Sequence, residues 1–238
     1  MPAVRRSRNL STVGTEALDS PALDPAVAGA TLRDIAISNA LFGGRRAVAY
    51  GVLQLVGRLD PERQLRVLDV GAGRGDVLAD LRRRWARRGV TLAGLALDRH
   101  REAARLCRGH GLPAVVGDAF ALPLRSGSVD VVVASQLLHH FTRAAALDLV
   151  REFTRVVRIG VVIADLRRTL AARIGIQLAA RLLRFHPVSR ADGVVSVDRG
   201  FTLGELRDLL HRAAVPAVVR RRPGFRLVAW WRSNHAHG

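Results

Sequence analysis

A short run of glycines and acids near residue 70 has the composition of a ligand-binding turn. The stretch 67–76 (VLDVGAGRGD) is typical of a buried strand, a glycine turn and the first residue of a helix. Gly71 and Gly73 lack a Cβ atom, so the backbone there can approach a ligand closely. In parallel α/β sheets such a turn lies at the carboxyl edge, where nucleotides bind. These residues therefore predict a nucleotide cradle.

Two acids beside this turn restrict the kind of nucleotide. Asp69 stands two residues before Gly71, and its carboxylate would repel the pyrophosphate of a dinucleotide. Asp76 occupies the position at which the dinucleotide motif G-x-G-x-x-G requires Gly or Ala. S-adenosylmethionine (SAM) carries an ammonium and a sulfonium but no phosphate, and a carboxylate helps to hold it. The turn thus favours SAM over a dinucleotide.

Two further acids end the next predicted strands. Asp98 follows Gly71 by 27 residues and is placed to accept hydrogen bonds from both ribose hydroxyls. Asp118 is placed to accept from an adenine amino group, while the backbone of Ala119 meets a ring nitrogen. The alternatives are a solvated acid at a strand end for Asp98 and a turn acid after Gly117 for Asp118. We favour the nucleoside roles for both.

A histidine pair and an acid follow the two later strands. His139 and His140 come just after the fourth predicted strand, and Asp165 ends the fifth. A histidine near a carboxylate suits a general base that takes a proton from a hydroxyl group. Such a base is expected to titrate near the pKa of an ordinary histidine side chain, about 6.5. Adjacent histidines point in different directions, so we expect one of them to face a substrate. The alternative is a structural histidine, with Asp165 paired to Arg167 or Arg168.

The elements that must position these residues alternate regularly from residue 65. We expect strands at 65–70, 91–97, 114–116, 129–134 and 160–164, and helices at 76–88, 101–108 and 143–157. This β-α-β-α order predicts a mostly parallel sheet with helices on both faces. A capping box at Thr202 and Glu205 starts a helix to about residue 213. Segments 215–220 and 225–231 then form an antiparallel hairpin.

Segments on either side of this pattern are expected to form a cap. Residues 1–30 lack periodicity and predict a mobile arm. Thr31 is predicted to cap a first helix, and residues 31–57 provide two cap helices. Residues 167–200 form a cap insertion, in which Leu170, Ile174, Leu178, Leu182 and Phe185 recur at helical spacing. The stretch 186–200 is predicted as a polar loop.

With these motifs the chain resembles the class I SAM-dependent methyltransferases over residues 31–238. The resemblance is best marked at 67–76, at Ala96–Asp98, at 117–120 and at 128–141 (SVDVVVASQLLHHF). The segments LPLRSGSVD and LLHHF are similar to the ubiquinone/menaquinone-type and bacterial natural-product O-methyltransferase branch. The resemblance implies a Rossmann-like, mostly parallel seven-stranded α/β sheet that ends in an antiparallel hairpin.

The same resemblance implies which residues bind SAM and act on its acceptor. The cofactor set it implies is Asp69, Gly71, Ala72, Gly73, Asp98, Arg99, Asp118, Ala119, Ser135 and Gln136. Similar natural-product O-methyltransferases carry a His-His pair and an Asp at the places of His139, His140 and Asp165. Methyl transfer also proceeds by proximity and desolvation alone, since the sulfonium is already a reactive donor. No metal site is expected.

Composition limits the class of protein and its partners. The 38 basic residues, all arginine, exceed the 20 acids and give a net charge of +18, which leaves nucleic acid or an acidic carrier open as a partner. The arginines are spread along the chain without interleaved aromatics, so nucleic acid is the less favoured partner. One cysteine excludes an internal disulfide. Without a signal peptide or membrane-spanning run, a cytoplasmic location is expected.

The sequence therefore predicts a SAM-dependent methyltransferase whose acceptor is a small molecule with an aromatic or polyketide hydroxyl group. The alternatives are an enzyme acting on RNA or on a carrier-bound acyl chain, and a SAM-binding scaffold without activity. No Asn/Asp-Pro-Pro-aromatic block follows the fourth strand, which argues against an amino-group methylase. The acceptor, the methylated atom and the oligomeric state are left open by the residues.

Overall fold

A computed structural model describes residues 14–20, 22–57 and 64–233. Its centre is a seven-stranded sheet in the order β3-β2-β1-β4-β5-β7-β6. The strands are β1 (Gln64–Val70), β2 (Thr91–Asp98), β3 (Ala114–Val116), β4 (Val129–Ser135), β5 (Val157–Leu166), β6 (Val218–Arg222) and β7 (Arg226–Arg232). Strands β1 to β5 pair in parallel, and β7 runs antiparallel to β5 and β6. The predicted fold class is confirmed, and β5 begins three residues before the predicted Gly160.

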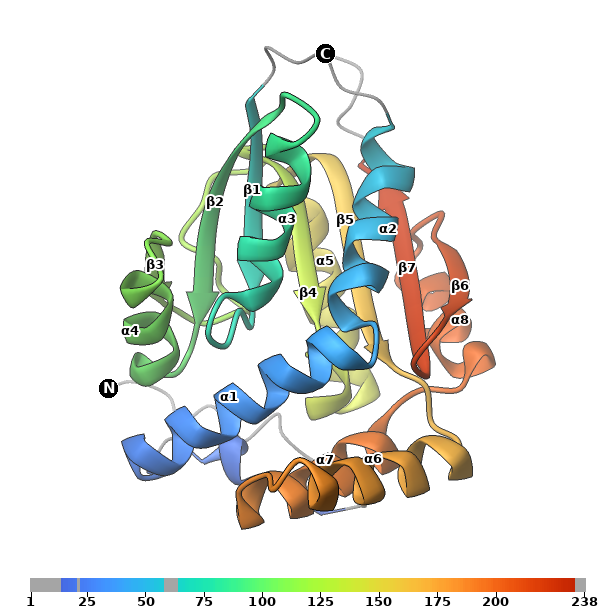
Figure 1. Cartoon of the computed structure of the whole chain (residues 1–238). Helices are drawn as coiled ribbons and strands as arrows, with labels where there is room; N and C mark the ends of the chain where they lie inside the picture. The colour runs from blue at the N-terminus through green and yellow to red at the C-terminus, as the bar shows by residue number, and fades with distance from the viewer. Residues whose placement is uncertain (1–13, 21, 58–63, 234–238) are drawn as a thin grey trace, which may run out of the picture.

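The described helices pack around the sheet in three groups. They are α1 (Pro25–Leu41), α2 (Gly44–Val56), α3 (Asp76–Ala86), α4 (Arg101–Gly109), α5 (Arg143–Val156), α6 (Leu170–Leu182), α7 (Pro187–Arg199) and α8 (Leu203–Arg212). Helices α2, α3 and α4 cover one face of the sheet, and α5 and α8 cover the other (Figure 1). Helices α1, α6 and α7 lie across the end at which the parallel strands finish (Figure 1).

Burial on both faces explains why the central strands are continuous apolar runs. Strand β4 has the sequence VDVVVAS, and its first six residues are buried, because helices cover both sides of a parallel sheet. One face of the sheet packs on Phe153 of α5 and Leu209 of α8, and the other on Leu78 and Trp85 of α3. This packing fixes the strand ends, where the predicted chemistry lies.

The N-terminal segment differs from its prediction. Helix α1 begins at Pro25, because Asp24 caps it by accepting hydrogen bonds from the amides of Ala26 and Val27. Thr31, the predicted cap, lies inside this helix and is fully buried. Residues 17–19 form a 3-10 turn, η1 (Ala17–Asp19). Residues 17–19 and 25–30 of the predicted arm therefore have regular structure, and residues 1–13 and 21 lie outside the described part.

The prediction of a polar loop at 186–200 is also wrong, because residues Pro187–Arg199 form helix α7. The imidazole of His186 caps this helix by accepting a hydrogen bond from the amide of Val188, and Pro187 occupies its first turn. Two polar residues of α7 are buried against the N-terminal segment: Asp192 accepts from the amide of Ala17, and Arg199, which pairs with Glu16 and Asp19, is 4% exposed. Some of the polar residues that suggested a loop at 186–200 therefore make buried contacts with the N-terminal segment.

Helix α6 forms as its periodicity predicts, but with its apolar stripe outward. Leu170, Ile174, Leu178 and Leu182 are 71%, 47%, 61% and 84% exposed. The buried residues of this helix are the small Ala172 and Ala180. Across the described residues, none of the helices is both long enough and apolar enough to cross a bilayer.

Candidate functional site

Every residue predicted to bind the cofactor lines one cavity of about 210 Å³ at the carboxyl ends of β1, β2 and β4. The cavity wall includes Asp69, Gly71, Ala72, Gly73, Asp98, Arg99, Asp118, Ala119, Ser135 and Gln136, together with His139 and His140. Asp165, which is fully buried, lies behind His139 and holds its ring. The structure thus brings together groups that are separated by almost 100 residues of sequence.

The glycine turn is shaped by backbone conformation. The backbone φ angles of Gly71, Gly73 and Gly75 are 70°, 55° and 80°, values that residues with a Cβ atom rarely adopt. A Cβ on Gly71 would also lie 2.8 Å from Cδ1 of Leu137. The amide of Gly71 donates to the carbonyl of Leu97 at 2.8 Å, so β2 holds the turn in place.

Asp98 connects this turn to the end of β2. Its Oδ2 accepts from the amide of Gly73 and its Oδ1 from the amide of His100, both at 2.9 Å. Each carboxylate oxygen has a second lone pair, so two acceptors point from a fixed carboxylate toward the cavity that it lines. This arrangement fits a ligand with two neighbouring hydroxyl groups, as the sequence predicted for a ribose.

Asp69 is a buried acid in the wall of the cavity. It is 1% exposed, and neither carboxylate oxygen has a hydrogen-bond partner. Burial, followed by the negative charges of Asp76 and Asp98, raises the pKa of Asp69 well above its usual range. A cationic ligand would relieve this repulsion, whereas a phosphate would add to it. The chemistry of the cavity therefore fits the ammonium and sulfonium of SAM.

The other wall of the cavity comes from the ends of β3 and β4. Asp118 is exposed, and its Oδ1 accepts from the amide of Phe120 at 2.9 Å. Gln136 adopts a φ of 54°, and its Nε2 donates to Oδ1 of Asn39 at 2.6 Å. Asn39, on α1, was not predicted as a site residue, because only the folded chain places α1 over the strand ends.

His139 is held in a buried polar network. Its Nδ1 lies 2.6 Å from Oδ1 of Asp165, and its Nε2 lies 3.6 Å from Oε1 of Glu16. Asp165 also accepts from the amides of Leu138, His139 and Leu166. Burial disfavours protonation of His139, but the charge and hydrogen bond of Asp165, together with the charge of Glu16, outweigh it and raise the pKa of His139 to about 10. His139 is therefore protonated at neutral pH and cannot give the titration near 6.5 expected of an ordinary histidine base.

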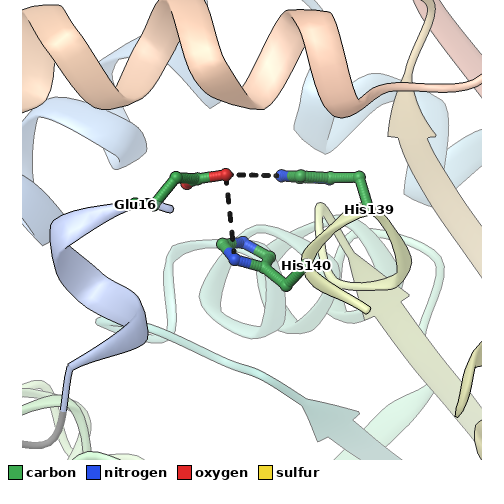
Figure 2. A group of neighbouring side chains, drawn as sticks. All are labelled: Glu16, His139 and His140. Carbon is green, nitrogen blue, oxygen red and sulfur yellow. Dashed lines mark ion pairs between the residues drawn. The ribbon is translucent and has the colours of Figure 1, made fainter. Parts of the chain in front are cut away.

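Glu16 and Asp19, on the turn η1, complete this network from the N-terminal segment. Figure 2 shows the carboxylate of Glu16 facing both imidazoles, with 3.8 Å between its Oε1 and Nδ1 of His140. Oδ1 of Asp19 lies 2.9 Å from the same Nδ1. Burial disfavours the charged form of Glu16, but His140 and His139 outweigh it and lower its pKa to about 2. The fully buried Arg199 pairs with both acids, at 3.4 Å and 2.9 Å.

The ligand-type atoms of Glu16, His139 and His140 lie within 4.8 Å of one another, a spacing at which a metal ion can be held. The guanidinium of Arg199 and the proton on His139 already supply positive charge to Glu16. Sequence reasoning missed Glu16, Asp19 and Arg199. The spacing of Glu16 and Asp19, which form a reciprocal capping box, is the local signal that was available.

A second, smaller cavity of about 110 Å³ adjoins the first. Ile35, Gln136 and Ser196 line both cavities. The second cavity lies among α1, α6, α7 and the start of β7, and its wall is largely apolar, with Phe42 and Phe185 among its residues. The structure thus has two neighbouring chambers with a shared wall, one polar and one apolar, under the helices that cross the strand ends.

Comparison with known proteins agrees with this chemistry. Residues 67–160 match a family described as "Methyltransferase domain". The tRNA (carboxymethyluridine(34)-5-O)-methyltransferases ALKBH8 of Mus musculus and Xenopus tropicalis are 32% and 31% identical over 97 residues. These matches cover 40% of this chain but only 13% and 14% of the relatives, so the chain corresponds to about one seventh of their length.

Solved methyltransferase structures share the fold over most of the chain. A SAM-dependent methyltransferase from Aquifex aeolicus has a TM-score of 0.59 at 17% identity, covering 88% of this chain and 98% of that one. The plantazolicin methyltransferase BpumL, in complex with SAH, has a TM-score of 0.63 at 13% identity, with coverages of 88% and 95%. TnmH has a TM-score of 0.57 at 25% identity, with coverages of 84% and 57%. Residues 67–160 thus match a methyltransferase domain, and the chain shares the fold of solved SAM-dependent methyltransferases.

Proposed function

We propose that this enzyme transfers the methyl group of SAM to a hydroxyl group of a small aromatic or polyketide-type molecule. The observation that carries the proposal is the apolar cavity of about 110 Å³ that shares the wall residues Ile35, Gln136 and Ser196 with the cofactor cavity. An apolar chamber beside the methyl donor suits a small ligand, since such sites bury most of the surface of their ligands. The presence of this chamber also favours an enzyme over a scaffold whose acceptor pocket is filled.

Three helices form the roof of the acceptor chamber in this proposal. They are α1, from the N-terminal cap helices 31–57, and α6 and α7, from the cap insertion 167–200. The turn η1 packs beneath α7 through the contact between the amide of Ala17 and Asp192. We propose that these segments open to admit the acceptor and then exclude water during methyl transfer.

We propose His140 as the base. Oδ1 of Asp19 lies 2.9 Å from Nδ1 of His140, so Nε2 is the ring nitrogen left to take a proton. The side chain of His140 is 19% exposed and lines the cofactor cavity, whereas that of His139 is 1% exposed. His139, protonated between Asp165 and Glu16, is a positioning residue that fixes the loop after β4 and stabilises negative charge on the acceptor oxygen.

The chemistry then divides between cofactor and protein. When bound, SAM supplies an activated methyl group, and its sulfur keeps the electron pair of the carbon–sulfur bond that breaks. Asp98 holds the ribose hydroxyls, Asp69 holds the ammonium, and Asp118 with Ala119 recognises the adenine. His140 takes the proton of the acceptor hydroxyl as the new oxygen–carbon bond forms, and releases it to water afterwards.

A screen of phenolic and polyketide acceptors with methyl-labelled SAM tests the proposal. We expect His140→Ala to lower the turnover number by about 100- to 10,000-fold, the usual contribution of a general base, with unchanged affinity for SAH. His211→Ala, at an exposed histidine of α8, is the matched control and keeps wild-type turnover. If His140→Ala and Asp19→Asn both keep wild-type turnover, His140 is not the general base. If no small molecule in the screen takes up the label, the proposed acceptor class is refuted.

A second acceptor class is RNA. It is favoured by the net charge of +18 and by the similarity of 97 residues to tRNA methyltransferases. Under this alternative, unmodified tRNA would take up label from SAM, and its binding would weaken steeply with added salt, because phosphate contacts release counterions. The same labelled assay therefore decides between the two classes.

A further inference from the structure

The second cavity contains polar atoms that have no partner. Thr31 Oγ1, Ser189 Oγ and Arg226 Nη1 are buried and make no hydrogen bond, and all three residues line this cavity. Such orphaned atoms are rare in folded proteins, because each costs about 1–3 kcal/mol in lost hydration. The remaining orphaned atoms at the cofactor cavity include both oxygens of Asp69, which SAM accounts for. A ligand with polar atoms would account for those of the second cavity in the same way.

Arg226 is the charged residue among these three, so its burial is the least favourable. It begins β7 and is 3% exposed, and its Nε donates to the carbonyl of Phe42 at 3.3 Å. Within the described part of the chain no carboxylate forms an ion pair with it. Burial lowers its pKa to about 10 against the opposing charges of Asp165 and Asp76, so the guanidinium remains charged at neutral pH. A buried charge without a counter-ion is unfavourable unless a ligand pairs with it.

The acids of the cavity wall do not supply this counter-ion. Oδ2 of Asp34 accepts from the amide of His186 at 2.8 Å, and its Oδ1 lies 3.8 Å from Arg33. Both oxygens of Asp192 accept from the amide of Ala17 at 3.0 Å. Each acid is thus engaged with the backbone of the cap. Asp165 and Asp76 attract the guanidinium of Arg226 from beyond ion-pair distance, so among the described residues it has no directly paired carboxylate.

We propose that the second cavity binds acceptors that join an anionic oxygen, a carboxylate or a phenolate, to an apolar body, and that Arg226 pairs with this oxygen. The proposal rests on the proposed function, since it names the acceptor class of the same enzyme. Phe42, Ile176 and Phe185 provide apolar contacts, and Thr31 and Ser189 provide hydroxyl groups for a second oxygen. An apolar cavity of about 150 Å³ accommodates a benzene molecule, so a chamber of about 110 Å³ limits the apolar body to no more than a single ring.

Calorimetric titration of the full chain saturated with SAH tests the anion directly. The probes are 4-methylbenzoate and its neutral counterpart 4-methylbenzamide. We expect the benzoate to bind wild-type protein at least about tenfold more tightly, as for one charge-assisted hydrogen bond. Arg226→Met should abolish this preference, whereas Arg232→Met, at an exposed arginine of the same strand, should keep it. Titration of 4-nitrophenol, whose ionised form absorbs visible light, distinguishes a phenolate from a carboxylate site.

Each result has one interpretation. Equal binding of benzoate and benzamide to wild-type protein, together with no ionisation of bound nitrophenol, overturns the proposal even if Arg226→Met fails to fold. A preference for the anion that Arg226→Met retains also overturns it. If the preference depends on Arg226 but no small molecule is methylated, the anion site stands and the proposed function fails. If neutral phenols are methylated equally well by wild-type and Arg226→Met protein, the proposed function stands and this assignment fails.

Discussion

Replacing Asp165 with asparagine tests the buried pair on which the histidine cluster depends. Asp165 is fully buried, and its carboxylate lies 2.6 Å from Nδ1 of His139. Asparagine keeps the size and one oxygen acceptor but removes the negative charge. Breaking a buried ion pair by removing one partner leaves an uncompensated charge and costs about 3–5 kcal/mol. We expect Asp165→Asn to lose that amount of unfolding free energy at pH 7.

The pH dependence gives the sharper test. The folded protein holds a proton on His139 up to a pKa of about 10, whereas an unfolded histidine loses it near pH 6.5. The native state therefore binds one more proton than the unfolded state between these values. Its stability is fully present below about pH 6.5 and falls by about 1.4 kcal/mol per pH unit as pH rises toward 10. In Asp165→Asn the pKa of His139 moves down, and the slope becomes shallower.

Urea denaturation from pH 7 to pH 8.5 measures this slope. In that range the buried Cys107 thiol, whose pKa burial raises to about 12, stays protonated in the folded protein and adds little. Asp148→Asn, at an exposed acid of α5, is the matched control and should retain the wild-type slope. A wild-type stability that stays flat over this range, or an equal slope in Asp165→Asn, would refute the assignment of the proton to His139.

Further expectations concern the cofactor, the metal and the cap. Asp98→Ala should weaken SAH binding by about 1–3 kcal/mol, as for a fixed acceptor that loses its ligand hydroxyls, and an unchanged dissociation constant in calorimetry would exclude Asp98 from the site. EDTA should leave turnover unchanged, because Arg199 and the proton on His139 already neutralise Glu16; activity lost to EDTA and restored by Zn²⁺ would show a metal site. Hydrogen exchange in η1 and α7 should slow when product and acceptor bind together, and equal protection with and without ligands would argue against an opening cap.

The cofactor half of the site was predictable from sequence because its chemistry depends on local spacing. Gly71 and Gly73 follow Asp69 within four residues, and Asp98 and Asp118 each stand at or within two residues of the end of an apolar run. Parallel pairing then brings all these ends to one edge, so no further information is needed to place them together. The fold class follows from the same alternation of strands and helices.

The helical cap was less predictable, because tertiary contacts decide its structure. Helix α7 has little apolar periodicity of its own and forms where Asp192 and Arg199 pair with the N-terminal segment. In helix α6 the leucines face outward and the alanines pack inward, the reverse of what hydrophobicity alone predicts. Local propensity is a weak guide wherever a helix buries polar or small residues.

The acceptor half of the site was decided by the tertiary structure alone. The sequence identified His139, His140 and Asp165 as a group from their positions after neighbouring strands, and this proximity is observed. Glu16, Asp19 and Arg199 reach the same cluster from segments about 120 and 60 residues away, and they change its protonation. The role of Arg226 as a candidate anion-binding residue likewise depends on its burial. Nothing in the sequence shows that this arginine is shielded from water and has a guanidinium nitrogen without a hydrogen-bond partner. Spacing along the chain specifies which groups meet at a sheet edge, whereas desolvation and pairing between distant segments set their charge.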